Sequence, residues 1–360
     1  MRRSRGFSLP ELLVAITLGL IVLGALLGLF AGTRSANRST TGISGLTDGG
    51  RFALDFLSAA GRVAGFYSCS NASRHITILN PGATPLPFSF GNPVSGYEAA
   101  GTGPATALLL PAGPAVGDGN AGDWTGGLDA ALGGRVVKGS DVLVVRTSLP
   151  RNGATPALPV YVTAIADGTN NFNVNTPGNL ANGQIAVIAD CVNAVSFQVT
   201  GFNGVTVLHD IGGGPPGNAQ TAFPISFSVG AEVMPLTTSV YYIGVGADGD
   251  GALFVMDLNA TGVFTTRELV PDIENMQVLY GFDITGNQTS YQYMTADQVT
   301  NWAQVASIKV AVLAASAPNA VPTPLVAQTY NLLGTTVTAP IDSRSRQAFD
   351  ATITVRNLVN

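Results

Sequence analysis

The chain has 360 residues, of which 46% are hydrophobic and only 11% are charged, and its formal net charge is −5. This length allows one large domain or two ordinary ones with ample core. The net negative charge argues against a nucleic-acid partner, because binding to phosphates requires basic residues. Two cysteines cannot complete a four-ligand zinc site, and only two histidines, His75 and His209, could help them.

The N-terminus combines three arginines with a long apolar stretch. Residues 12–31 contain no charged side chain, and a helix of this length spans about 30 Å, the thickness of the hydrocarbon core of a bilayer. Arg2, Arg3 and Arg5 precede the stretch, so the short N-terminal end should stay cytoplasmic and the large remainder should be exported. The sequence therefore predicts a single-pass membrane protein.

A secretory signal peptide and a plain membrane anchor are alternatives for this segment. A signal peptide usually has a shorter apolar stretch of about 7–15 residues, and it would avoid an acid such as Glu11 at its edge. A plain anchor gives no reason for Glu11 either, since a carboxylate beside hydrocarbon is costly unless a partner charge meets it.

Residues 6–12 read GFSLPEL, which resembles the type IV prepilin cleavage motif. The resemblance implies that a prepilin peptidase cuts between Gly6 and Phe7 and N-methylates the new amine of Phe7. Glu11 could then meet the amine of an adjacent subunit in an assembly, so that two charges are neutralised together. Pro10 is compatible with the first turn of a helix, where its missing N–H has no intrahelical partner.

The apolar stretch is predicted to continue as an amphipathic helix. We divide the chain into a leader (1–6), a transmembrane half-helix (7–31), an amphipathic continuation (32–66) and a β-rich periplasmic body (67–360). Apolar and small residues recur at spacings of three and four between 43 and 64, as one helix face requires. Several glycines between 42 and 50 predict a bend or weak segment over residues 39–50, because glycine costs about 1 kcal/mol in a helix.

The body is predicted to consist mainly of short strands. Residues 79–135 are rich in Gly, Pro, Ala, Thr and Asn and indicate an irregular, exposed insert. Short apolar runs between turn signals then predict strands at 141–147, 159–164, 185–189, 195–200, 225–229, 240–245, 253–256, 276–282, 307–313 and 351–355. A short helix is expected near 296–303. One long helix followed by many short strands predicts an α+β fold with mostly antiparallel sheet.

Five further stretches resemble the PilW-type minor pilins. They are GRFALDFL at 50–57, the run from 62 to Cys69, IADC with FQVT at 188–200, ELVP with MQVLYG at 268–281, and the closing run at 346–357. The resemblance implies a structural subunit that joins other minor pilins before the major pilin is added. Residues 201–240 match no family that we can name.

Two pairs of residues suggest possible bonds or ligands. If the body is exported, Cys69 and Cys191 are expected to form one disulfide, which would stabilise the fold by up to about 4–5 kcal/mol through loop closure. Asp248 and Asp250 lie in a DGDG run that predicts a hairpin turn. They are also a weak calcium candidate, although position 259, where an EF-hand would close with glutamate, is Asn.

The sequence thus predicts a pilin-like structural subunit with no catalytic residues and no cofactor. Its expected partners are the membrane, a prepilin peptidase, other minor pilins and the major pilin. Its expected location is the bacterial inner membrane with the body in the periplasm, and the pilus after assembly. The alternatives are a pseudopilin of a type II secretion system, an adhesin carried on a pilin stem and, as the weakest, a membrane-anchored enzyme.

Overall fold

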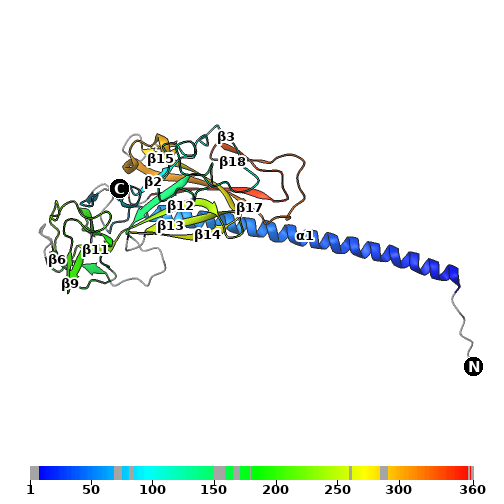
Figure 1. The fold of residues 1–360 in the computed structure, drawn as a ribbon, viewed down its shortest axis with the longest axis horizontal. Coiled ribbons are helices and arrows are strands. Elements are labelled where there is room, and N and C mark those ends of the chain that lie inside the picture. The colour runs from blue at the N-terminus through cyan, green and yellow to red at the C-terminus, as the bar shows by residue number, and fades with distance from the viewer. Residues whose placement is uncertain are drawn as a thin grey trace, which may run out of the picture.

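The computed structural model describes residues 8–68, 75–80, 85–148, 159–164, 171–178, 180–258, 262–283, 291–355 and 357. A single long helix, α1 (Leu9–Val63, 55 residues), projects from a β-rich body, and Figure 1 shows its N-terminal part standing clear of that body. We call residues 9–41 the stem and the chain from Gly42 onward the body. The predicted α+β architecture with mostly antiparallel strands is confirmed.

The C-terminal part of α1 buries one face against the sheets. Its buried residues recur at helical spacing: Gly42, Leu46, Gly50, Ala53, Leu57, Ala60 and Gly61. The helix runs through 39–50, where a weak segment was predicted, without a break. The glycines there serve close packing instead: a Cβ at Gly42 would lie 2.5 Å from the Cβ of Ala320, and one at Gly50 would overlap the ring of Phe349. The last helical residue is Val63, three short of the predicted end.

Two antiparallel sheets and α1 enclose the main core of the body. The first sheet has the order β14 (Phe264–Pro271), β13 (Gly251–Leu258), β12 (Thr237–Val245), β4 (Val142–Thr147) and β2 (Val94–Tyr97). The second has the order β16 (Tyr291–Met294), β15 (Ile273–Asp283), β17 (Val305–Ala315) and β20 (Arg346–Thr354). Fully buried side chains such as Leu57 from α1, Tyr241 from β12 and Val310 from β17 belong to one cluster, so the helix and both sheets share this core.

A second group of strands forms a lobe at the end of the molecule opposite the stem (Figure 1). This distal lobe spans residues 159–236 and is inserted between the paired strands β4 and β12. Its strands are β5 (Val160–Tyr161), β6 (Asn171–Asn173), β7 (Ile185–Ala189), β8 (Ala194–Gln198), β9 (Gly201–Asn203), β10 (Thr206–Leu208) and β11 (Glu232–Pro235), with β1 (His75–Thr77) parallel to β8. Phe172, Phe197 and Phe223 form an aromatic core of its own.

Most of the predicted strands are present, with two corrections. Nine of the ten predicted runs overlap a strand, whereas 225–229 does not. There the buried ring of Phe227 packs into the lobe core, and the backbone forms a single β-bridge at Phe227 instead of a strand. The predicted helix near 296–303 is replaced by two 3₁₀ turns, η2 (Ala296–Gln298) and η3 (Trp302–Gln304). Thr295 donates its hydroxyl to Asp297 rather than capping a longer helix, and Asn301 starts a second, separate turn.

The Gly- and Pro-rich region at 79–135 is irregular where it is described, but it is not simply an exposed insert. It contains α2 (Pro85–Phe88), β2 and β3 (Ala107–Leu109), and β3 joins a small sheet with β19 (Thr335–Thr338) and β18 (Thr329–Leu332). Trp124 and Leu132 are fully buried in a separate cluster under the first sheet. The indole N–H of Trp124 donates to the carbonyl of Ser140 at 3.0 Å, which anchors the region to the body.

Candidate assembly interface

Ser8 and Glu11 form a capping box at the start of α1. The backbone N–H and the hydroxyl of Ser8 donate to Oε2 of Glu11 at 3.1 and 2.9 Å. Such a box supports the helix end, because the first N–H groups of a helix have no intrahelical acceptor. Pro10 lies in this first turn, as expected. Glu11 therefore has a local partner in the isolated chain, while Gly6 and Phe7 lie outside the described residues.

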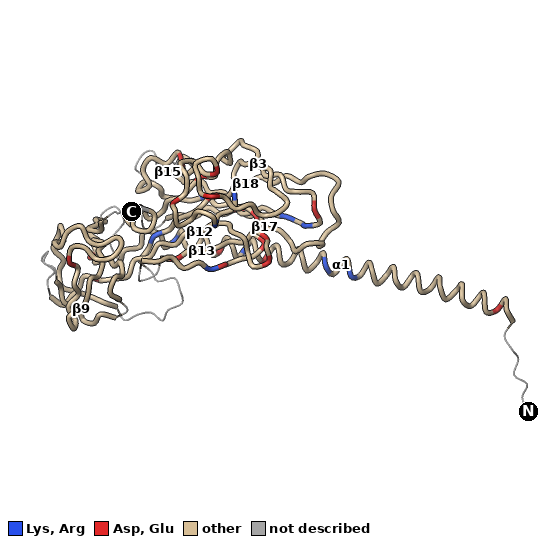
Figure 2. Tube along the Cα trace, in the orientation of Figure 1, with Lys and Arg blue, Asp and Glu red and all other residues tan. Residues whose placement is uncertain are grey.

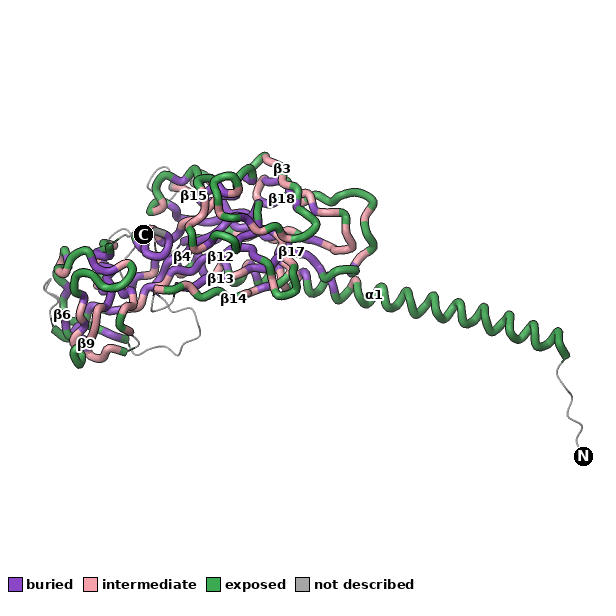
Figure 3. Tube along the Cα trace, viewed as in Figure 1, coloured by how far each residue is buried: buried purple, intermediate pink, exposed green. Residues whose placement is uncertain are grey.

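The stem is apolar and uncovered. Every side chain from Ser8 to Arg38 is exposed, as the continuous green of the stem in Figure 3 shows. Figure 2 shows that most of its length carries no charge. Within the described residues α1 is the one helix long and apolar enough to cross a bilayer. An apolar surface of this extent indicates a membrane or other apolar helices as its surroundings.

A groove with a cavity volume of about 1830 Å³ lies where the stem enters the body. Its floor is one face of α1 between Leu23 and Phe56, with residues at three- and four-residue spacing. Its walls are two body segments that we call the rim: residues 269–272, at the end of β14 and the turn to β15, and residues 314–320, from the end of β17 onward. Phe30 and Phe52 in the floor are 67% and 59% exposed. The groove is thus a mainly apolar surface that the chain itself does not cover.

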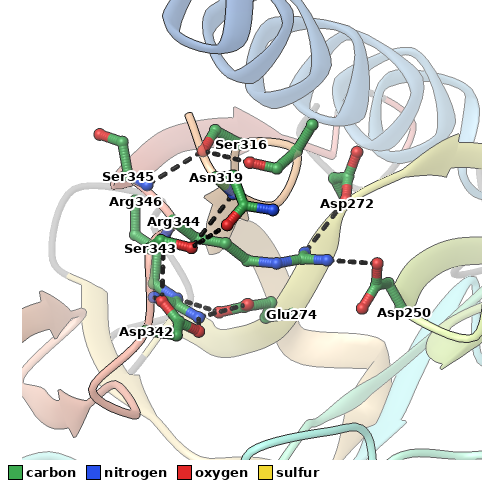
Figure 4. A network of polar contacts seen from close by, with 11 residues as sticks. Asp250, Asp272, Glu274, Ser316, Asn319, Asp342, Ser343, Arg344, Ser345 and Arg346 are labelled. Atoms are coloured by element: carbon green, nitrogen blue, oxygen red, sulfur yellow. Dashed lines mark hydrogen bonds and ion pairs between the residues drawn. The ribbon is translucent and has the colours of Figure 1, made fainter. Parts of the chain in front are cut away.

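A network of charged side chains holds the rim in place (Figure 4). Arg344 pairs with Asp250 in the β12–β13 turn and, at 3.3 Å, with Asp272 in the rim. Arg346, which is only 3% exposed, binds Glu274 through Nε and Nη2 at 2.6 and 2.9 Å. We call this network, with Asp342, the clasp.

Asp342 completes the clasp on the other side of Arg346. Its two oxygens accept from Arg346 at 2.8 and 2.6 Å, and these hydrogen bonds lower the pKa of Asp342. Burial opposes the charge of Arg346, but the hydrogen bonds to Asp342 and Glu274 outweigh it and raise the pKa of Arg346. Nearby, the N–H of Asn319 donates to Ser343 Oγ at 3.1 Å. The rim segment 314–320 is therefore also held by a hydrogen bond between uncharged groups.

The predicted calcium and disulfide residues lie in two different parts of the fold. Asp248 and Asp250 occupy the hairpin turn between β12 and β13, as predicted, with Gly249 at φ +83°. Asp250 is engaged by Arg344 in the clasp, and the described residues contain no cluster of three or more potential metal ligands. Cys191 lies between β7 and β8 in the distal lobe and is not a free thiol. Cys69 lies outside the described residues.

Two family models match the chain. A prokaryotic N-terminal methylation motif matches residues 1–27, and Type IV Pilus-assembly protein W matches residues 240–357. The C-terminal third of the chain is thus similar to the PilW family of type IV pilus-assembly proteins, and its N-terminus carries a methylation motif. The PilW match contains both rim segments and the whole clasp, whereas the distal lobe precedes it. No curated protein and no solved structure matches the chain.

The PilW match indicates a role in pilus assembly, and the N-terminal motif implies processing by a prepilin peptidase. A role in assembly in turn implies pilin partners. The methylation motif and the apolar stem are consistent with a place in the inner membrane or the pilus. The matched PilW family is one of structural pilus-assembly proteins that are not typically enzymatic.

The buried charged side chains of the body have structural roles. Asp141 joins the two main sheets, because its carboxylate accepts from the N–H of Ala99 at 2.9 Å and of Val278 at 2.8 Å. Glu98 is 5% exposed, and its Oε2 has no hydrogen-bond partner. Burial, followed by repulsion from Asp141 and Asp297, raises the pKa of Glu98, so this side chain holds a proton near neutral pH.

Arg146 is a second buried charge, and its guanidinium is hydrogen-bonded mainly to carbonyl oxygens rather than paired with a carboxylate. Its guanidinium donates to the carbonyls of Asn92 and Leu86 at 2.9 and 2.8 Å and to the hydroxyl of Ser95 at 3.0 Å. Burial lowers the pKa of Arg146 to about 10. The backbone of Arg146 accepts from Gly65 N–H just after α1, so the residue ties the end of the helix to the loop before β2. These contacts indicate a structural anchor.

Several interface features were missed from the sequence. Ser8 and Glu11 have the S-x-x-E spacing of a capping box, which could have been recognised. The rim segment 314–320 lies in the long uncharged run 310–341, which is bounded by Lys309 and Asp342. That run and the Arg-x-Arg pair after it were the only signals of the rim and the clasp in the sequence. The clasp joins residues up to 94 positions apart, and such contacts leave no local pattern.

Proposed function

We propose that this chain is a minor pilin-like structural subunit that helps to start or cap a type IV pilus. In the proposal, the leader is removed between Gly6 and Phe7, and Phe7 is N-methylated. The mature stem is held in the inner membrane with the body in the periplasm, until the subunit enters the pilus. The observation that supports this best is the stem itself, an uncovered apolar helix fixed rigidly to a folded body.

The proposed assembly step relies on helix packing and on Glu11. In the described chain Glu11 is exposed and bonds only to Ser8 in its own helix. The amine of a neighbouring Phe7 would supply a charge for this carboxylate, so both charges could enter an apolar bundle together. The hydrophobic effect does not drive helix association inside a membrane. Close van der Waals contact between stems and the pairing of Glu11 with an amine would supply the attraction instead.

The test must separate assembly from helix capping, because Glu11 does both. The Glu11→Ala variant should be exported and present in membranes at wild-type level but absent from sheared pili. Ser8→Ala is the matched control: it removes the hydroxyl partner of the capping box and leaves the carboxylate of Glu11 in place. This variant should assemble normally. Normal piliation with Glu11→Ala, or an equal loss with Ser8→Ala, would contradict the proposed role.

A pilin-borne adhesin is a second candidate, which the distal lobe favours. The lobe has its own aromatic core, lies opposite the stem and falls outside the PilW match. Val192, Val205 and Ile211 are apolar side chains on it that are 50%, 46% and 64% exposed. Replacing all three by Asp should leave piliation unchanged and abolish adherence of cells if the lobe binds a surface. Unchanged adherence would exclude these side chains as the contact.

A further inference from the structure

The distal lobe carries almost no charge. Residues 159–236 include no lysine, no arginine and only four acids, whereas twelve of their side chains are the amides of Asn and Gln. Figure 2 accordingly shows no basic residue in the lobe. The three acids that the structure describes are held inside the chain: Asp190 accepts two backbone N–H groups at 2.8 and 2.7 Å, and Asp210 and Glu232 each accept a hydroxyl, at 3.5 and 2.5 Å. The lobe therefore offers no cation to a phosphate, sulfate or carboxylate ligand.

Three short antiparallel strands form the outermost sheet of the lobe, in the order β6, β10, β9. Both β6 and β9 lie at the end of the molecule farthest from the stem (Figure 1). Phe172 and Val207 point inward, because both are buried in the lobe core. Side chains alternate between the two faces of a strand, so the residues next to them form an outer face. Asn171, Asn173 and Asn203 are exposed there, and the sheet thus turns its amides toward solvent.

One row of this outer face consists of amide and hydroxyl groups. Asn173, Thr206 and Asn203 are direct cross-strand partners, so they lie side by side at the strand spacing of about 4.8 Å. The hydroxyl of Thr206 donates to Oδ1 of Asn173 at 2.8 Å, which fixes the orientation of that amide. Amides and hydroxyls both donate and accept hydrogen bonds, so this polar row can bind ligand groups of either kind.

The second row of the face places an apolar patch beside these polar groups. Leu208 pairs with Asn171 on one side and with Gly201 on the other. A Cβ placed at Gly201 would lie 3.4 Å from Cδ1 of Leu208, so the Leu208 side chain leans over a position that has no side chain of its own. The result is a low apolar patch about 7 Å along the strands from the polar row.

Adjacent polar and apolar rows of this kind suit a neutral sugar chain. Sugar hydroxyls donate and accept hydrogen bonds, as the amides of the polar row do, and the C–H faces of a sugar ring are apolar, as Leu208 is. An apolar ligand would bury the amides without hydrogen-bond partners, which is unfavourable. A polyanion would find no lysine or arginine in the lobe. An uncharged ligand with many hydroxyl groups therefore matches the face best.

We propose that the outer face of the β6–β10–β9 sheet binds a neutral polysaccharide, with the polar row bonded to sugar hydroxyls and Leu208 under a sugar ring. This inference rests on the second proposed function, an adhesive lobe, and names the class of its ligand. The face lies opposite the stem, so a sugar chain can reach it while the stem is held in a membrane or in a pilus.

The test measures binding of the full-length protein, in a detergent without a sugar headgroup, to an immobilised panel of oligosaccharides. The panel contains neutral chains of glucose, galactose, mannose and N-acetylglucosamine, with heparin as a polyanion. Wild-type protein should bind at least one neutral member and should not bind heparin. Thr206→Val keeps a β-branched residue in β10 and removes the hydroxyl, and Asn173→Leu removes the neighbouring amide. Each should weaken binding about fivefold or more, the value of one or two neutral hydrogen bonds.

Asn182→Leu is the matched control, because Asn182 is an exposed amide in a turn outside the sheet, and this variant should bind like wild type. Binding to no neutral member, preferential binding to heparin, or unchanged binding by both Thr206→Val and Asn173→Leu overturns the proposal. Self-association that Thr206→Val abolishes, without any sugar binding, would assign the face to a second copy of the chain and overturns it as well.

Two competitors distinguish the sources of such a chain. One is polysaccharide secreted by the organism's own cultures, and the other is neutral glycan released from cells to which the organism adheres. The proposal expects at least one of them to displace the bound oligosaccharide, and displacement by neither overturns it.

The outcome is separable from both proposed functions. Sugar binding by the purified chain needs no pilus, so Glu11→Ala, which tests assembly, should bind like wild type. If the Asp substitutions at Val192, Val205 and Ile211 abolish adherence while no sugar binds, the ligand inference fails and the adhesive function stands. If a neutral sugar binds but adherence is unchanged in Asn173→Leu cells, the adhesive function fails and the binding site stands.

Discussion

The stability of the body should fall as pH rises from 5 to 7, because Glu98 is buried as a neutral acid. The groups that face it are Asp141, the phenol of Tyr280, and Asp297 at the surface. Burial raises the pKa of Asp141 as well, but both of its oxygens accept backbone N–H groups, which lower that pKa in part, whereas Oε2 of Glu98 has no partner. The extra proton of the folded state is therefore assigned to Glu98.

The sign and size of the effect follow from linkage. The pKa of Glu98 is raised in the folded protein, so folding takes up a proton between the ordinary glutamate value and the raised one. The stabilisation is fully present below the unfolded pKa and is lost as pH rises through the folded pKa. One proton corresponds to a slope of about 1.4 kcal/mol per pH unit, or about 2–3 kcal/mol between pH 5 and 7.

The assay is urea unfolding of the detergent-solubilised full-length protein at several pH values. Glu98→Gln keeps the shape and the neutral state, so it should remove this slope and raise the free energy of unfolding at pH 7 and above. Asp55→Asn, which changes an exposed acid on α1, is the control and should leave the slope unchanged. A wild-type stability that is flat over this range, or a slope that persists in Glu98→Gln, would refute the assignment of the proton.

Three further predictions concern the clasp, the helix packing and the cysteines. Arg346→Ala should destabilise the body by about 3 kcal/mol or more, because it leaves the partly buried Glu274 and Asp342 without their partner. The side chain of Arg267 is 59% exposed, so Arg267→Ala should cost less than about 1 kcal/mol in the same denaturation assay. Gly50→Ala should lower the free energy of unfolding by about 1–3 kcal/mol through overlap with Phe349. Gly45→Ala, at an open position, should be neutral or stabilising. Equal melting temperatures for the two variants would contradict this packing. Peptide mapping without reductant should find Cys69 joined to Cys191; two free thiols in correctly exported protein would rule out the bond.

The sequence predicted the parts of the fold that depend on local pattern. The apolar stretch and the stripe after it predicted α1, and short apolar runs located most of the strands of both sheets. Residues 225–229 have the same local pattern, but they contribute the buried ring of Phe227 to the lobe core and do not form a strand. Periodicity reports which side chains are buried, and it does not report whether a neighbouring strand is available for pairing.

The rest of the interface depends on contacts between distant residues. The glycines at 42 and 50 were read as weak points in a helix, because only the fold shows that Ala320 and Phe349 need the space above them. The clasp and the rim were missed for the same reason, since Arg344 meets aspartates in two turns that are far away in sequence. The prepilin motif, in contrast, is a linear signal that an enzyme reads, and the matched methylation motif confirms it.

The intact mass and N-terminal sequence of the protein purified from native membranes test the central account most directly. The account predicts a chain that begins at N-methylated Phe7, with Met1 to Gly6 removed. A chain that still begins at Met1 would indicate a simple membrane anchor, and one that begins near residues 32–36 would indicate a secreted protein. Either result would contradict the pilin-like account and leave Glu11 without a role in assembly.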